Sequence, residues 1–150
     1  MSATELFLAN VIALESEAAG HYESFAQRAL QAGDVELEAF FSGLAELTRL
    51  EAGEARAGGG LNARASLVVE RLRELTDQPR SAIQVGGAAV LDVHRAMTQA
   101  LELKRRSHAY YASMAALNTD PTVRQMAQAF ETEGAAHLAA LEQWIVRLGA

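Results

Sequence analysis

Apolar and small residues recur along most of this chain at the spacing of about 3.6 residues that places them on one face of an α-helix. Short groups of turn-forming residues interrupt this pattern. The periodicity and its interruptions together predict four long helices. The first covers residues 4–32, the second runs from a cap at Asp34 to the glycine run 58–60, the third covers residues 88–117, and the fourth runs from Pro121 to about residue 148. The chain is therefore expected to be all-α.

Turn residues indicate how these helices are connected. Gly33 and Asp34 leave a short turn between the first two helices, and Pro121 opens the fourth soon after the third ends. A shorter helix is predicted from Asn62 to Leu75, within a long crossover between the second and third helices. Two short turns and one long crossover are typical of a four-helix bundle with ferritin-like connectivity. We therefore predict that fold.

The sequence also contains a weak internal repeat. One offset superposes the first predicted helix on the third, and a slightly shorter offset superposes the second on the fourth. The superposed pairs include Leu14 with Leu103, Tyr22 with Tyr111, Ser24 with Ser113, Leu44 with Phe130 and Glu51 with His137. Each copy is therefore predicted to be one pair of helices.

Composition and charge exclude several classes of function. Half of the 150 residues are apolar, which suffices for the core of a single domain over residues 1–150. The net charge of −6 argues against nucleic-acid binding, and the absence of cysteine excludes disulfides, thiolate metal sites and iron–sulfur clusters. No stretch has the ~20 apolar residues of a membrane span, and no signal sequence is recognisable. A cytoplasmic protein without a nucleic-acid or membrane partner is expected.

Bundles with this connectivity can hold two metal ions, using one Glu from each of two helices and a Glu-x-x-His pair from each of the others. The segment from Ala13 to Tyr22 resembles the first helix of rubrerythrin-like proteins of the ferritin-like superfamily, in which a ligand Glu stands seven residues before a Tyr. The segment from Asp120 to Trp144 resembles the last helix of that family. The resemblance implies a ferritin-like bundle and, where the ligands are intact, di-iron chemistry with oxygen or peroxide.

Most of the ligands that the resemblance implies are replaced in this chain. Glu15 and His137 remain at two of the six positions. The other four positions hold Thr48, Glu51, Lys104 and Gly134. We therefore expect the di-iron centre to be lost, with no catalytic residues and no bound cofactor. Lys104 is expected to place its ammonium group where a metal ion would lie, paired with Glu15 or Glu51.

Two functions are compatible with these replacements. In the first, the bundle is a structural or binding module for a protein or small-molecule partner, and a homodimer is compatible with it. In the second, a rebuilt site holds iron or manganese and supports oxidase- or peroxidase-type activity. The candidate ligands are Glu15, Glu51, Glu133 and His137. Glu133 and His137 share a helix face because they are four residues apart, whereas the charge of Lys104 opposes a nearby divalent cation.

Other polar and aromatic residues are interpreted as structural. Tyr22, Tyr110 and Tyr111 are expected in the core with hydrogen-bonded hydroxyl groups, and Trp144 is expected to be a packing residue. The remaining histidines lie next to polar neighbours and are expected at the surface. They are His21, His94 and His108.

Overall fold

The structure is a computed structural model that describes residues 2–57 and 87–149, with side chains described for residues 2–57 and 94–146. Its helices are α1 (Ala3–Gln31), α2 (Val35–Arg56), α4 (Gly87–Leu117) and α5 (Pro121–Gly149). These bounds agree closely with the four predicted helices. No strand occurs in the described ranges, which confirms the all-helical class, and no described helix is long and apolar enough to cross a membrane. The short helix predicted over residues 62–75 lies outside the described residues.

Capping residues set the helix ends as the sequence predicts. Asp34 accepts a hydrogen bond from the backbone N–H of Leu37 at 3.1 Å. Asp120 accepts two such bonds from the first turn of α5, at 2.9 and 3.2 Å. Gly33 has a φ of 78°, a conformation that glycine adopts without steric cost, and it follows the end of α1. These tight turns make α1 and α2 antiparallel, and likewise α4 and α5.

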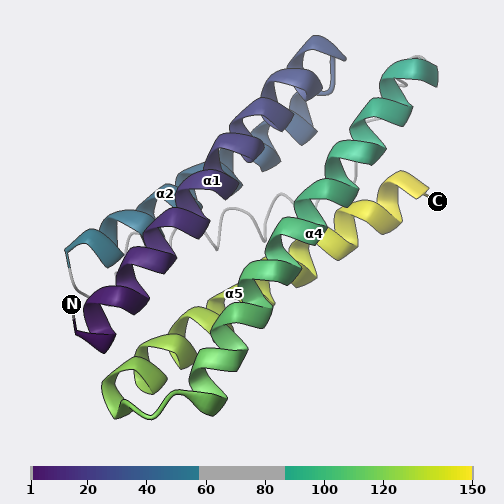
Figure 1. The fold of residues 1–150 in the computed structure, drawn as a ribbon. Helices are drawn as coiled ribbons and strands as arrows, with labels where there is room; N and C mark the ends of the chain where they lie inside the picture. Colours follow the sequence, from purple (N-terminus) through teal and green to yellow (C-terminus); the bar gives the residue numbers. More distant parts are fainter. Residues whose placement is uncertain (1, 58–86, 150) are drawn as a thin grey trace.

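The two helix pairs pack against each other mainly through α1 and α4 (Figure 1). Helices α1 and α5 run in one direction, and α2 and α4 run in the other. The end of α2 and the start of α4 therefore lie at opposite ends of the bundle (Figure 1). Each antiparallel pair corresponds to one copy of the internal repeat.

Two apolar clusters fill the interior at successive levels along the bundle, and each described helix contributes to both. One cluster includes Tyr22, Phe25, Phe40, Phe41, Met97 and Trp144. The other includes Phe7, Val11, Tyr111, Val123 and Phe130. Trp144 is buried, with its ring centroid 5.0 Å from that of Phe40, which confirms its role in packing.

Candidate metal centre

A layer of buried polar side chains separates the two apolar clusters. On α1, for example, Glu15 lies between Val11 of one cluster and Ala18 of the other. The layer consists of Glu15 from α1, Thr48 and Glu51 from α2, Lys104 from α4 and His137 from α5, none of them more than 2% exposed. Burying a charged group is costly unless it is paired or becomes neutral. The contacts within this layer therefore decide what it can do.

Lys104 forms a buried ion pair with Glu15. The Nζ atom lies 3.8 Å from Oε2 of Glu15, and Oε1 of the same carboxylate accepts a 2.5 Å hydrogen bond from the Tyr111 hydroxyl. Burial by itself would lower the pKa of Lys104, but the neighbouring acidic groups, Glu15 first, outweigh burial and raise it above 10.5. Lys104 therefore remains an ammonium ion, and its predicted pairing with a buried carboxylate is confirmed.

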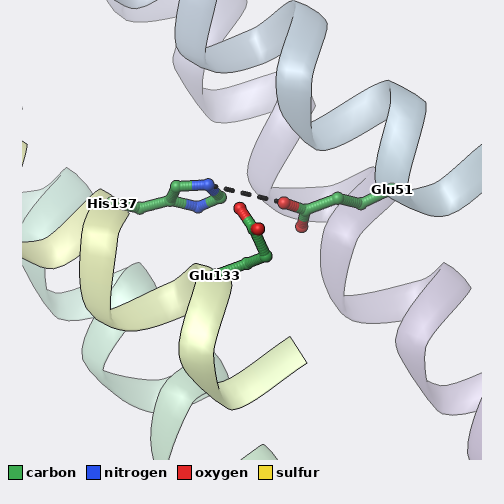
Figure 2. A group of neighbouring side chains, drawn as sticks. All are labelled: Glu51, Glu133 and His137. Carbon is green, nitrogen blue, oxygen red and sulfur yellow. Dashed lines mark ion pairs between the residues drawn. The ribbon is translucent and has the colours of Figure 1, made fainter. Parts of the chain in front are cut away.

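Glu51, Glu133 and His137 form a second group in the same region (Figure 2). One possible ligand atom of each residue lies within 4.8 Å of the other two. His137 Nε2 is 3.4 Å from Glu51 Oε1, and Figure 2 shows the Glu133 carboxylate pointing toward the space beside them. Glu133 and His137 are about one turn apart on α5, and Glu51 reaches them from α2.

Burial favours the uncharged forms of Glu51 and His137. It raises the pKa of the Glu51 carboxyl well above 4.5; the negative charge of Glu15 adds to this rise, and Lys104 opposes it. Burial also lowers the pKa of His137 well below 6.5, and the charge of Lys104 lowers it further. The imidazole is therefore neutral at neutral pH, which is the form that binds metal ions.

Several buried atoms of this group have no hydrogen-bond partner among the described residues. They are both ring nitrogens of His137 and Oε1 of Glu51. Nε2 approaches Oε1 to 3.4 Å, but without the geometry of a hydrogen bond. An unsatisfied buried polar atom costs about 1–3 kcal/mol. A cation ligated by Oε1 of Glu51 and by one ring nitrogen of His137 would remove part of that cost, so the donor set fits one metal ion.

The same layer does not fit two metal ions. The Thr48 hydroxyl donates a 2.7 Å hydrogen bond to the Leu44 carbonyl within its own helix. Gly134 has no side chain, and Lys104 fills the space beside Glu15 with a positive charge. A second cation in this space would be repelled by the ammonium group at close range.

The structure brings together three of the four predicted ligands. Glu51, Glu133 and His137 converge, whereas the Glu15 carboxylate contacts Lys104 and Tyr111. The sequence-based interpretation treated all four residues as one site, because helix periodicity places residues on a face but does not choose between neighbouring partners.

The two repeat-related tyrosines differ in their surroundings. Both are buried as predicted, and Tyr111 has the expected hydrogen bond, to Glu15. Tyr110, also predicted in the core, is only half-buried, and its hydroxyl accepts a 3.0 Å hydrogen bond from Asn10. The Tyr22 hydroxyl has no hydrogen-bond partner within the described part of the chain, contrary to expectation, and its ring centroid lies 5.8 Å from Lys104 Nζ. Burial raises the pKa of Tyr22 to about 12, although Lys104 opposes the rise, so the hydroxyl keeps its proton.

His108 and His94 are both half-buried, so the prediction that they lie at the surface holds only in part. For His108 the reason is its packing against α5. The His108 Cδ2 atom is 3.2 Å from where a Cβ at Gly134 would be. His108 is four residues after Lys104 on α4, so both project from the same helix face. That spacing, together with a glycine on α5, was the sequence signal for this contact. His21 is exposed, as predicted, near Glu17.

Comparison of the chain with models of known protein families, with curated proteins and with solved structures found no match. Inferences about function therefore rest on the geometry of the polar layer and on the sequence resemblance.

Proposed function

We propose that this protein is a rubrerythrin-like helical bundle that binds a single divalent transition-metal ion, iron or manganese, through Glu51, Glu133 and His137. The observation that carries the proposal is the convergence of these three side chains: ligand atoms of Glu51 and His137 are buried and have no hydrogen-bond partner among the described residues, and Glu133 is half-buried beside them. Carboxylate oxygens and one imidazole nitrogen suit both metals. The resemblance and the antiparallel helix pairs support the rubrerythrin-like assignment.

Charge balance supports one ion. Glu51 and Glu133 together offset the charge of a divalent cation, while Lys104 is already offset by Glu15 at 3.8 Å. This pairing answers the objection that Lys104 repels a cation, because the ion pair has no net charge and its field falls off faster than that of a single charge. Binding requires Glu51 to lose its proton.

The proposal is for binding rather than for di-iron catalysis. An ion held by three protein ligands keeps positions open for water or a small ligand and acts as a Lewis acid there. In this chain, Glu51, Glu133 and His137 supply the ligands, and the apolar clusters above and below exclude bulk water from the layer.

A metal-independent structural or binding module is the second candidate. The observation in its favour is the buried pair of Lys104 and Glu15, which neutralises part of the layer without metal. Together with neutral Glu51 and His137, this pair leaves only a modest electrostatic cost in the metal-free bundle. Metal content separates the two functions.

The test is metal analysis of the whole chain. Metal-free protein is loaded anaerobically with Fe(II) or Mn(II), desalted and analysed, alongside His137→Ala and a control variant, His21→Ala, at an exposed histidine. We expect one ion per chain in the wild type and the control, and its loss in His137→Ala. Absence of metal from the wild type would contradict the proposal and favour the metal-independent module.

A further inference from the structure

We propose that the ammonium group of Lys104 occupies the place where the internal repeat would allow a second metal ion. Lys104 thereby limits the polar layer to one bound ion. This inference rests on the proposed metal site. It concerns how many ions the layer accepts, whereas the proposed function concerns whether it accepts any.

The first argument is that the buried contacts of the polar layer join equivalent positions of the internal repeat. Lys104 is the repeat equivalent of Glu15, and His137 is the repeat equivalent of Glu51. Two buried contacts join such equivalents: an ion pair at 3.8 Å between Glu15 and Lys104, and a 3.4 Å contact between Glu51 and His137, both of which are uncharged in the metal-free bundle. The layer therefore consists of two related half-sites, one with the candidate metal ligands and one with the ammonium group.

The second argument comes from the tyrosines. Tyr111 donates its hydroxyl hydrogen to Glu15 of the other helix pair. Its repeat equivalent, Tyr22, instead has Lys104 Nζ over its ring, 5.8 Å from the ring centroid, and a lysine ammonium group cannot accept a hydrogen bond from the hydroxyl. The Tyr22 hydroxyl accordingly has no hydrogen-bond partner in the described residues. The surroundings of position 104 thus suit a carboxylate, and Lys104 is the departure from the repeat.

The third argument is that the two half-sites are connected. Glu15 and Glu51 lie in the same buried layer, at 1% and 2% exposure, and the negative charge of Glu15 acts on the carboxyl of Glu51. A carboxylate at position 104 would therefore lie beside the Glu15 carboxylate, and the two could ligate a second ion. Glu51 would lie between this ion and the first. Replacing the ammonium group by a carboxylate reverses the charge and supplies a ligand, and both changes favour a second ion.

The experiment measures Mn(II) stoichiometry and affinity by equilibrium dialysis of the whole chain. Lys104→Glu reverses the buried charge, and Lys104→Met removes it without adding a ligand. The matched control is Arg105→Glu, the same charge change at the next residue of α4, where the side chain is exposed and 3.9 Å from Glu142. Far-UV circular dichroism establishes that each variant is folded.

We expect one ion for the wild type and for Arg105→Glu, and two for Lys104→Glu. Lys104→Met should bind one ion with affinity on the order of tenfold higher, because removing the ammonium group leaves the negative charge of Glu15 uncompensated near the ion. One ion at wild-type affinity in both Lys104 variants would overturn the inference. If Lys104→Glu does not fold, Lys104→Met decides, because unchanged affinity contradicts a cation that limits metal binding. A wild type without metal refutes the proposed function and the capacity of one ion. In that case an ion gained by Lys104→Glu would still show that Lys104 excludes metal from its half-site, and no gain would overturn that part as well.

Discussion

The two helix pairs share a backbone plan, but they bring opposite chemistry into the polar layer. The α1–α2 pair contributes two acidic groups, Glu15 and Glu51, whereas the α4–α5 pair contributes Lys104 and His137 at the equivalent positions. Each residue contacts its own equivalent. The difference shows that two helix pairs with matching apolar faces can carry complementary polar groups into one buried layer.

The largest effect on stability is expected from removing Lys104, the cation that the α4–α5 helix pair contributes to the polar layer. Lys104→Ala leaves Glu15 buried without its counter-charge, and breaking one partner of a buried ion pair costs about 3–5 kcal/mol. Urea unfolding of the metal-free protein measures this loss. Arg105→Ala, which removes an exposed cation from the same helix, is expected to cost less than about 1 kcal/mol. Equal midpoints for the two variants would show that Lys104 does not stabilise the layer.

The tyrosines offer a matched test of the asymmetry. Tyr111→Phe removes the hydrogen bond to the Glu15 carboxylate and is expected to cost about 1.5–3 kcal/mol. Tyr22→Phe removes a hydroxyl without a hydrogen-bond partner in the described residues, so its cost is expected to lie within about 0.5 kcal/mol of zero. Equal losses in chemical denaturation would indicate that the two hydroxyl groups are equally satisfied in solution.

The pH dependence of stability distinguishes the contributions of Glu51 and His137. Because the folded-state pKa of Glu51 is raised above 4.5, the unfolded chain ionises first as pH rises, and stability is lost above pH 4.5. The pKa of His137 is lowered, so its contribution to stability is instead lost as pH falls below 6.5. Glu51→Gln should therefore stabilise the metal-free protein at pH 8, on the order of 1 kcal/mol, and much less at pH 5.

Thermal melts of the metal-free wild type and Glu51→Gln at the two pH values measure this difference. The variant should keep the loss of stability on acidification that His137 causes. A gain in melting temperature that is equal at pH 5 and pH 8 would mean that the carboxyl of Glu51 is not protonated in the folded chain.

Periodicity and capping residues were sufficient to predict the helices, because Gly33, Asp34 and Asp120 act within a single turn of chain. The buried position of Lys104 was predictable from its equivalence to Glu15. The sequence did not predict which carboxylate contacts Lys104 and which contacts His137. Differences of a few ångströms between side chains on different helices decide that. For the same reason, the burial of His108 depended on packing against α5 and was missed.

The smallest expected effect concerns the equivalent positions Thr48 and Gly134, which are occupied differently in the two helix pairs. Thr48 satisfies its hydroxyl on its own helix, whereas Gly134 admits the ring of His108 from α4. Gly134→Ala gains about 1 kcal/mol of helix propensity, but its Cβ would lie 3.2 Å from His108 Cδ2, so the imidazole must shift. We expect a gain well below 1 kcal/mol in the wild type and the full gain in a His108→Ala background. A double-mutant cycle in urea measures this coupling, and additive effects would show that His108 does not pack against α5 in solution.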